Sequence, residues 1–367
     1  MTIDFVSLTA PGIAGLHPYQ PGKPVEELER EYGVSNAIKL ASNENPLGAG
    51  KRASTVIQSV AGEIHRYPDG NGFRVKSALA CQLGVRSENL TLGNGSSEVL
   101  ELVVRTFVSP ENQVIFSQHA FAVYPILTQA VGAEAVVTPA KDWGHDLVAM
   151  HNAITDRTRL IFIANPNNPT GTWLRSGELY SFLSGIPDHV LILVDEAYFE
   201  YVQEEEYPDT VRWLDDFPNL IVTRTFSKIH GLAGLRIGYG VSHPDLAELL
   251  NRVRQPFNSN SIALAAAEAA LEDADHVQKS IETNVSGLQQ LTAAFERLGL
   301  EFIPSVGNFI CVAFDRPGME IYEALLQRGV IVRPIAVYGM PDYLRVTVGS
   351  EEENARFIEA LEKTLAS

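Results

Sequence analysis

Two short runs of consecutive apolar residues, 160–164 and 190–194, constrain the fold of this chain more than any other feature. Aliphatic and β-branched residues without polar alternation are typical of strands buried on both faces of a parallel sheet. Between residues 45 and 256 such strands alternate with helical patterns, as they do in doubly wound sheets. The sequence therefore predicts an α/β fold with a large, mostly parallel sheet covered by helices.

A second, smaller unit is expected after this sheet. A long helical stretch covers about 259–298, with a break near 273–275. Strand, helix, strand and helix patterns follow at 308–314, 319–328, 343–348 and 351–365, which predicts a small α+β domain. The Pro- and Gly-rich N-terminal arm, with a short helix at 26–32 closed by Gly33, is expected to pack with that domain. The predicted division is 1–44 for the arm, 45–256 for the large ligand-binding domain and 257–367 for the small C-terminal domain.

Both apolar runs end in polar residues, where an open α/β sheet places its ligand-binding groups. Asp195 follows the run 190–194, and a carboxylate there can pair with a cationic ring nitrogen and keep it protonated. Asn168 lies in the turn after 160–164, where two prolines and a glycine fix the direction of its amide. Each residue also has an ordinary explanation, because Asp195 could cap a helix and Asn168 could form an Asx turn.

A lysine flanked by hydroxyl residues is the strongest chemical signal in the chain. Lys228 follows the hydroxyl residues Thr225 and Ser227, and Arg236 comes eight positions after it. A lysine forms a Schiff base when its pKa is lowered, whereas an arginine binds phosphate bidentately. These residues together fit an aldehyde that carries a phosphate, which points to pyridoxal 5'-phosphate. The alternative is a strand end with two solvated cations.

A glycine-rich loop offers a second anion-binding element. Ser96 and Ser97 follow two glycines at the start of an apolar-periodic segment, so backbone N–H groups there can bind phosphate. The same pattern could be a capping box in which Glu98 reaches back to the loop.

Together these segments resemble the fold-type I aminotransferases that use pyridoxal phosphate, over nearly the whole chain. Within that superfamily the likeness is closest to the histidinol-phosphate aminotransferase family. The narrower resemblance rests on the motifs at 41–48, 66–70, 165–171, 195–198, 227–236 and 344–349.

The resemblance implies a role for each cofactor-site residue. Lys228 is expected to form the Schiff base, Asp195 to partner the pyridine nitrogen, and Asn168 and Tyr198 to donate to the ring oxygen. Phe121 falls where the family stacks an aromatic ring on the cofactor, although it could equally be a core aromatic on a helix. The phosphate is expected to bind Ser96, Ser97, Thr225, Ser227 and Arg236.

The resemblance also implies substrate and subunit contacts. Arg345 is expected to clamp the substrate carboxylate, beside Asn168, and Arg333 to provide a second anion site. Tyr19 matches a position that covers the substrate, and Tyr67 matches a tyrosine that reaches the neighbouring subunit's cofactor phosphate. That implies a homodimer with shared active sites. Arg333 and Tyr19 could instead be structural, and Tyr67 could be an ordinary exposed tyrosine.

The predicted reaction is transamination between histidinol phosphate and 2-oxoglutarate, which gives imidazole-acetol phosphate and glutamate in histidine biosynthesis. Three alternatives stay open at this point. An aromatic aminotransferase acting on phenylalanine or tyrosine would use the same pocket, and a pyridoxal-phosphate decarboxylase would use the same fold. A ligand sensor without catalysis is the third, although the chain has no N-terminal helix-turn-helix pattern.

Composition excludes other classes of function. A net charge of −17 and a pI near 5.0 argue against nucleic acid or an anionic membrane as a partner. The nine histidines show no spacing typical of a metal site, so no metal is expected. The two cysteines cannot form a disulfide framework, and their apolar neighbours predict buried thiols. Neither a signal peptide nor an apolar run of about 18 residues is indicated, which predicts a cytoplasmic protein.

Overall fold

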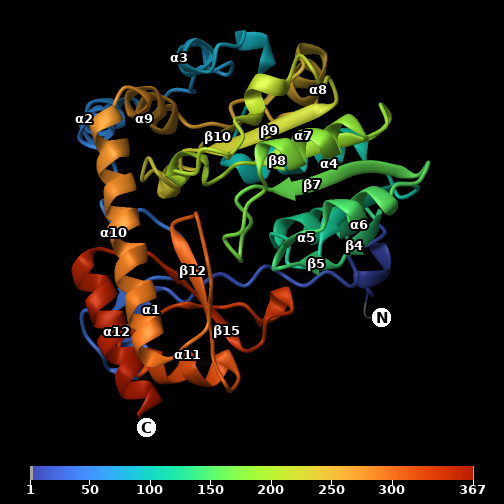
Figure 1. The fold of residues 1–367 in the computed structure, drawn as a ribbon. Helices are drawn as coiled ribbons and strands as arrows, with labels where there is room; N and C mark the ends of the chain where they lie inside the picture. Colours follow the sequence, from blue (N-terminus) through green and yellow to red (C-terminus); the bar gives the residue numbers. More distant parts are fainter. Residues whose placement is uncertain (1–2, 367) are drawn as a thin grey trace.

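The computed structural model describes residues 3–366 and contains a seven-stranded sheet in the upper part of the molecule as drawn in Figure 1. Strand β10 is antiparallel to both of its neighbours, whereas the other pairs are parallel. In spatial order the strands are β2 (Leu90–Gly93), β10 (Gly238–Ser242), β9 (Leu220–Thr225), β8 (Leu191–Asp195), β7 (Thr158–Ala164), β3 (Gln113–Ser117) and β4 (Glu134–Thr138).

The two apolar runs form the middle of this sheet, because their side chains feed cores on both of its faces. In β7, Ile161 and Ile163 pack into one core and Leu160 and Phe162 into the other. All four side chains are fully buried. A strand with water on one face would instead alternate polar and apolar residues. The prediction of a buried parallel sheet is therefore confirmed.

Helices cover both faces, as a doubly wound sheet requires. One face is packed by α2 (Lys51–Val60), α3 (Phe73–Leu83), α6 (Leu147–Asn152), α7 (Ser176–Ser184) and α9 (Ser261–Leu271). The other is packed by α4 (Ser96–Phe107), α5 (Val123–Ala130) and α8 (Pro244–Val253). The small hairpin β5 (Ala140–Lys141) and β6 (Gly144–His145) lies outside the main sheet.

A four-stranded antiparallel sheet forms the second unit, with its own apolar core. Its strands are β11 (Phe302–Ile303), β12 (Phe309–Ala313), β15 (Tyr343–Thr347) and β14 (Arg333–Pro334), and its helices are α10 (Ala274–Leu298), α11 (Gly318–Leu326) and α12 (Glu351–Leu365). The predicted helical break is confirmed, because α9 ends at Leu271 and α10 begins at Ala274.

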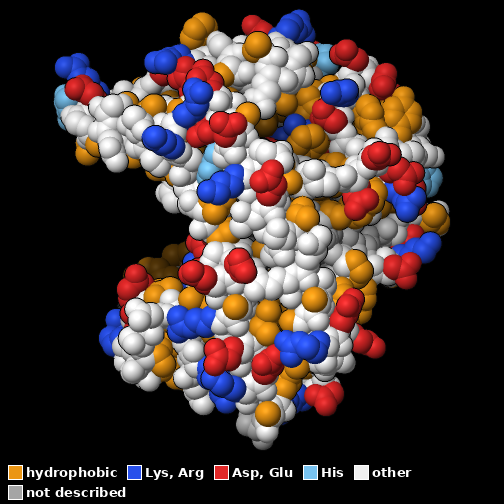
Figure 2. All heavy atoms as spheres, turned by 60° about the vertical axis from the view of Figure 1, so that its left-hand side comes forward, with side chains coloured by type: hydrophobic (Ala, Val, Ile, Leu, Met, Phe, Trp, Pro, Cys, Tyr) orange, Lys and Arg blue, Asp and Glu red, His pale blue; other side chains and the backbone are white. Residues whose placement is uncertain are grey.

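Figure 2 shows a notch on the surface of the molecule and acidic and basic side chains interspersed around it.

The N-terminal segment crosses from α1 (Val25–Tyr32) to the larger sheet by way of the second unit. Gly33 ends α1 in a left-handed conformation, with φ of 67°, as its position after the helix predicts. Strand β1 (Ile38–Lys39) then pairs with β13 (Val330–Ile331), and Leu40 joins the second core. Residues 41–45 are thereby carried into the space between the two sheets.

The expectation that both cysteines are buried has a different outcome at each position. Cys311 is buried in β12, but the expectation of a buried thiol is wrong for Cys81, which is exposed on α3. The apolar neighbours of Cys81 in the sequence lie on a different face of the helix. Among residues 3–366 no helix is both long enough and apolar enough to cross a membrane.

Candidate active site

A pocket of about 170 Å³ lies where β7, β8 and β9 end. Parallel strands bring their carboxyl ends to one edge of a sheet, so the polar residues that follow them meet there. Ten of the residues predicted for the cofactor site line this pocket: Ser96, Ser97, Phe121, Asn168, Asp195, Tyr198, Thr225, Ser227, Lys228 and Arg236.

Asp195 is a buried carboxylate whose neighbours are hydroxyl groups. Thr223 Oγ1 donates to Oδ1 at 3.0 Å and Tyr124 Oη donates to Oδ2 at 3.1 Å. Burial raises the pKa of Asp195 to about 6, although both hydroxyl donors oppose the rise. Within residues 3–366 no lysine or arginine forms an ion pair with it, and no helix begins at it. The carboxylate is therefore suited to a cationic ligand, and the helix-cap explanation is wrong.

Sequence reasoning did not identify the two residues that hold Asp195. Thr223 precedes Thr225 by two positions on β9, so strand alternation places both hydroxyls on one face of the sheet. That pattern was a usable signal for Thr223. Tyr124 lies 71 residues before Asp195, and nothing in its local sequence indicates that its hydroxyl points toward the sheet.

Lys228 follows β9 and is half-buried at the pocket wall. Its Nζ donates to the backbone oxygen of Ser42 at 3.2 Å and lies 5.6 Å from the centre of the Tyr198 ring. Burial, assisted by the positive charge of Arg345, lowers the pKa of Lys228 to about 8. A lysine with that pKa is partly neutral near pH 8, as a nucleophilic amine must be.

Another part of the pocket wall is a cationic group of residues at the start of α4. Arg236 adopts a left-handed backbone, with φ of 57°, and its Nη1 donates to Ser227 Oγ at 3.3 Å. A Cβ on Gly95 would lie 2.4 Å from Arg236 Nη2, so the turn before α4 has no room for a side chain. Arg236 pairs with no carboxylate in the described chain. Backbone N–H groups, hydroxyls and an uncompensated guanidinium together fit a phosphate.

The capping box considered for this loop is not formed, because the N-cap of α4 is Gly95 and has no side-chain cap, although Glu98 does reach back to the loop. Its carboxylate accepts hydrogen bonds from the backbone of Asn94 and from Asn258 Nδ2. Glu98 thus holds the loop through Asn94 and Asn258, and the N–H groups at the start of α4 stay available to the pocket.

The three parts of the pocket fit pyridoxal phosphate. A buried carboxylate that forms no ion pair in residues 3–366, a set of phosphate-binding groups and a lysine amine all line the pocket. Phe121 lines the same pocket just before α5 and meets Tyr124 edge-on at 5.7 Å. It is therefore available to contact a ring.

Asn168, Tyr198 and Arg345 form a chain of hydrogen bonds beside the lysine. Arg345 Nη1 donates to Asn168 Oδ1 at 2.5 Å, and Asn168 Nδ2 donates to Tyr198 Oη at 3.3 Å. Because the Asn168 amide bonds to these side chains, the Asx-turn alternative is wrong. Burial raises the pKa of Tyr198 to about 12, so its hydroxyl keeps its proton at neutral pH. Arg345 comes from β15 and thereby brings the second unit to the site.

Arg333 lies directly beside Arg345, since the two residues are partners in the β14–β15 register. Arg333 Nη2 donates to the Gln20 backbone oxygen at 2.7 Å, and its guanidinium lies 5.5 Å from the Tyr19 ring. Both arginines are at least nine-tenths buried, and neither pairs with a carboxylate in residues 3–366. Two neighbouring buried cations without counter-charges favour an anionic ligand. Tyr19 is half-exposed above them.

Tyr67 is the one residue predicted for the cofactor site that does not line this pocket. Its side chain is 82% exposed and stacks on Phe257, with ring centres 4.7 Å apart. That position agrees with a contact made outside this chain.

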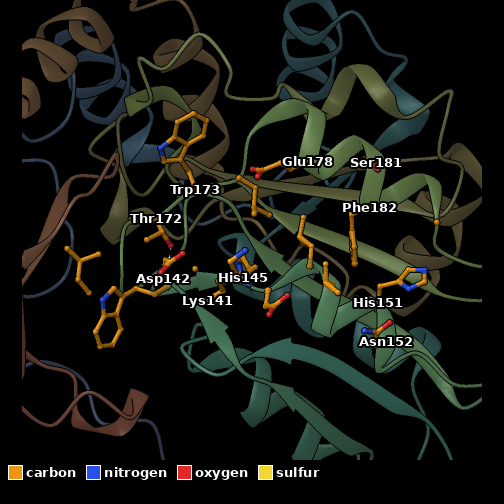
Figure 3. Close-up of a pocket in the computed structure, with 18 of the residues that line it drawn as sticks. Lys141, Asp142, His145, His151, Asn152, Thr172, Trp173, Glu178, Ser181 and Phe182 are labelled. Carbon is orange, nitrogen blue, oxygen red and sulfur yellow. Dashed lines mark hydrogen bonds between the residues drawn. The ribbon is translucent and has the colours of Figure 1, made fainter.

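A larger cavity, about 960 Å³ in volume, lies elsewhere between the two units (Figure 3). Trp143, Trp173, His145 and Glu178 are among its lining residues, together with Ile303 and Pro304 of the second unit. None of the residues predicted from the sequence lines it. Volume alone therefore does not identify the candidate active site, whereas charge and hydrogen bonding do.

Comparisons with known proteins agree with this site. Residues 35–361 match the family Aminotransferase class I and II. The chain is 60% identical over 361 residues to histidinol-phosphate aminotransferase 1 of Nitrosococcus oceani, with 98% of each covered. It is 58% identical over 368 residues to histidinol-phosphate aminotransferase 2 of Pseudomonas fluorescens, with 100% of each covered. The crystal structure of histidinol-phosphate aminotransferase from Sinorhizobium meliloti in complex with pyridoxal-5'-phosphate is similar, with a TM-score of 0.90, 29% identity and 98% of each chain covered. The predicted resemblance is confirmed, and this chain belongs to the class I and II aminotransferases.

Proposed function

We propose that this protein is a pyridoxal-phosphate-dependent histidinol-phosphate aminotransferase that works in histidine biosynthesis. It moves an amino group between histidinol phosphate and 2-oxoglutarate, giving imidazole-acetol phosphate and glutamate. The observation that supports this most is a pocket lined together by the amine of Lys228, a carboxylate without an ion-pair partner and an arginine without one within residues 3–366. The full-length similarity to proteins named for this activity supports the choice of substrate.

When bound, pyridoxal phosphate supplies an electron sink that makes the hydrogen on the substrate's amino-bearing carbon acidic. Asp195 would hold the protonated ring nitrogen, and Thr223 and Tyr124 orient its carboxylate. Arg236, Ser96, Ser97, Thr225 and Ser227 would hold the phosphate. Phe121 would pack against the ring, and Asn168 and Tyr198 would donate to its oxygen.

Lys228 has two tasks in this proposal. Its amine holds the cofactor covalently between reactions and, once released, carries a proton to and from the reacting carbon. Both tasks need a neutral amine near physiological pH, which burial and the charge of Arg345 favour.

The arginine pair would bind the anionic groups of both substrates. Glutamate has two carboxylates, one for Arg345 and one for Arg333. Histidinol phosphate has a phosphate ester, CH2–O–phosphate, in place of the α-carboxylate. Its anion therefore extends farther from the amino-bearing carbon and would take Arg333, with Tyr19 covering it. One pocket can thus accept two substrates with differently placed anions.

We also infer a cytoplasmic homodimer with the predicted three-part domain division. Tyr67 and Phe257 form an exposed aromatic stack, and Phe5 and Leu8 of the N-terminal arm are 71% and 73% exposed. Apolar side chains in such positions are typical of a protein–protein interface. In the proposed dimer Tyr67 reaches the cofactor phosphate of the partner subunit.

The substrate assignment is tested with Arg333→Ala. We expect KM for histidinol phosphate to rise about 10- to 100-fold, because a lost charge-assisted contact is worth about 1.5–3 kcal/mol. KM for phenylalanine, which has no second anion, should change less than about 3-fold. Arg297→Ala is the matched control, since Arg297 forms an exposed ion pair with Glu362 on the surface. Equal losses for both substrates would contradict the role of Arg333. A wild-type enzyme that prefers phenylalanine would contradict the proposed function.

A further inference from the structure

Three consecutive residues of the N-terminal segment contact three residues of the candidate active site. The Ala41 backbone oxygen accepts from Arg345 at 2.8 Å, and the Ser42 backbone oxygen accepts from Lys228 at 3.2 Å. The third contact is made by a side chain, because Asn43 Nδ2 donates to Tyr198 Oη at 2.8 Å. No role was predicted for Asn43 beyond its place in a motif.

The orientation of the Asn43 amide is fixed by the second unit. Its backbone N–H donates to Thr347 Oγ1 at 2.9 Å, and that hydroxyl donates to Asn43 Oδ1 at 3.2 Å. Asn308 Nδ2 donates to the Asn43 backbone oxygen at 3.0 Å. Since Oδ1 is an acceptor in this arrangement, the NH₂ group must face Tyr198.

The Asn43 backbone is in a conformation that few side chains adopt. Its φ is 54°, in the left-handed region, and the residue is 99% buried. Asparagine tolerates this region better than other residues that carry a Cβ, but it still costs free energy. The strain is held by the contacts with Thr347 and Asn308 of the second unit.

Two amide donors occupy the lone pairs of the Tyr198 hydroxyl. Asn43 Nδ2 lies 2.8 Å from Oη and Asn168 Nδ2 lies 3.3 Å from it. A tyrosine oxygen accepts about two hydrogen bonds and donates one. Its own proton has no acceptor among the hydrogen bonds of residues 3–366, so it is left for a group in the pocket.

We propose that Asn43 is a positioning residue that aims the Tyr198 proton into the pocket and makes its direction depend on the position of the second unit. The identity of the acceptor, the ring oxygen of pyridoxal phosphate, rests on the proposed function. Thr347 lies on β15 and Tyr198 follows β8, so Asn43 joins the two sheets at the site.

The charges around Tyr198 agree with this role. Burial raises the pKa of Tyr198, whereas the charge of Arg345 and the hydrogen bond from Asn43 lower it; Asp195 and Tyr338 raise it. A donor that makes the phenol more acidic also makes it a stronger hydrogen-bond donor. Loss of Asn43 should therefore weaken what Tyr198 donates.

The test compares Asn43→Gly, Tyr198→Phe and the double variant as holoenzymes. Glycine adopts the left-handed backbone without strain, so only the amide is lost. Asn36→Gly is the matched control, because Asn36 has φ of 55° in an exposed turn and only its backbone oxygen is bonded, to Arg356. Thr347→Val, which frees the amide while leaving Asn43 in place, is the second variant if Asn43→Gly does not fold.

The first readout is the pH midpoint of the bound cofactor's visible absorbance change, measured without substrate. Loss of one hydrogen bond that favours the unprotonated chromophore should raise this midpoint by about 0.5–1 unit in Asn43→Gly. The second readout is kcat/KM, which we expect to fall about 10-fold. In the Tyr198→Phe background, Asn43→Gly should shift the pH midpoint by less than about 0.2 unit. It should lower kcat/KM by less than about 2-fold. Thr347→Val should shift the midpoint in the same direction by a smaller amount.

An equal midpoint shift in both backgrounds, or no shift in the native background, would overturn the proposal. A shift with Asn36→Gly of the same size would overturn it too. Because the midpoint needs no substrate, it decides the role of Asn43 whichever amino donor the enzyme uses.

Discussion

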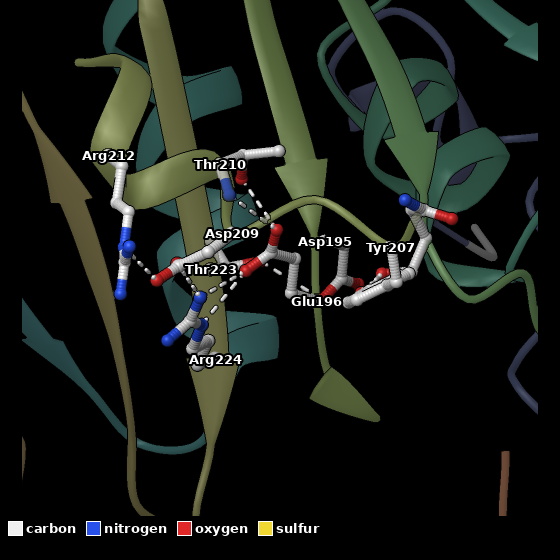
Figure 4. Close-up of polar contacts among 9 residues, drawn as sticks. Asp195, Glu196, Tyr207, Asp209, Thr210, Arg212, Thr223 and Arg224 are labelled. Atoms are coloured by element: carbon white, nitrogen blue, oxygen red, sulfur yellow. Dashed lines mark hydrogen bonds and ion pairs between the residues drawn. The ribbon is translucent and has the colours of Figure 1, made fainter. Parts of the chain in front are cut away.

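Asp195 and Glu196 are adjacent carboxylates at the end of β8, yet their surroundings are opposite. Both are buried, 5% and 0% exposed. Glu196 Oε2 accepts from Arg224 Nε at 2.9 Å and from Nη2 at 2.7 Å, and its Oε1 accepts from Thr210 Oγ1 at 2.6 Å (Figure 4). Within residues 3–366 Asp195 accepts from two hydroxyl groups and forms no ion pair, although the charge of Lys228 acts on it.

The difference separates a structural charge from a functional one. Burial lowers the pKa of Arg224, but the neighbouring acidic groups, Glu196 first, raise it overall. Burial raises the pKa of Glu196 as well, but the Arg224 charge and the Thr210 hydrogen bond oppose that rise, so the Glu196 charge has a partner within the protein. Asp209 accepts a further bond from Arg224 at 2.7 Å, and the guanidinium lies 3.4 Å from the Phe199 ring centre. The charge of Asp195 lacks such a balance until a cationic ligand binds. Changes on the Asp195 side should therefore cost activity, and changes on the Glu196 side should cost stability.

Lys228→Ala should give the largest effect on the activity side. We expect kcat for transamination to fall about 10⁴-fold or more, because the amine provides both the covalent link and the proton transfer. The apo-protein should unfold within about 1 kcal/mol of wild type. Lys363→Ala, at an exposed lysine on α12, is the control and should keep full activity. Substantial turnover by Lys228→Ala without added amines would rule out the proposed centre.

Asp195→Asn should lower kcat about 10²- to 10³-fold, since a neutral amide does not keep the ring nitrogen protonated. Cofactor affinity should fall less than kcat. Steady-state kinetics at saturating cofactor and equilibrium binding of the cofactor measure the two effects separately. Near-normal kcat would mean that the contrast between the two carboxylates has no catalytic meaning.

Glu196→Gln should give the opposite pattern. We expect the free energy of unfolding of the apo-protein to fall by about 3 kcal/mol, because Arg224 loses its fully buried counter-charge and keeps only Asp209, whose side chain is 32% exposed. The folded fraction should keep kcat within about 5-fold of wild type. Denaturant unfolding followed by circular dichroism checks the first value. A loss of kcat without a loss of stability would reverse the assignment.

The pH dependence of apo-protein stability sharpens the contrast further. The pKa of Asp195 is raised to about 6 in the folded state. The protonated carboxyl therefore adds to the free energy of unfolding at pH values below its unfolded pKa, and this stabilisation is lost as pH rises through the folded pKa. Relative to Asp195→Asn, the wild-type apo-protein should lose about 3 kcal/mol in total between about pH 3 and pH 7, of which about 2 kcal/mol is lost between pH 4 and pH 6. Unfolding curves of both proteins at several pH values give this difference. A difference that stays constant over that range would show that Asp195 already has a hidden counter-charge.

Much of the site could be predicted because it depends on local patterns. The apolar runs before Asn168 and Asp195 fix two buried strands, and parallel strands bring the residues after them to one edge. The hydroxyl residues around Lys228 lie within a few positions of it. The predicted fold and family are confirmed, whereas the individual roles of the site residues stay predictions.

Other parts of the site depend on contacts between distant segments. Arg345 reaches Asn168 across 177 positions, and Asn43 reaches Thr347 across 304. Local periodicity carries no information about which side chains meet at such separations. Likewise the helical pattern did not reveal that Cys81 is exposed, because that depends on which face of α3 packs on the sheet.

The sequence alone determined the alternation of buried strands and helices, and the positions of the lysine, of the residues proposed to bind phosphate and of the two carboxylates at the end of β8. It could not assign those carboxylates to different tasks. Successive residues at a strand end point to opposite sides, so Asp195 faces Tyr124 and Thr223 while Glu196 faces Arg224. Only the packing of distant elements on each side decides that one charge is neutralised inside the protein and that the other is kept for a ligand.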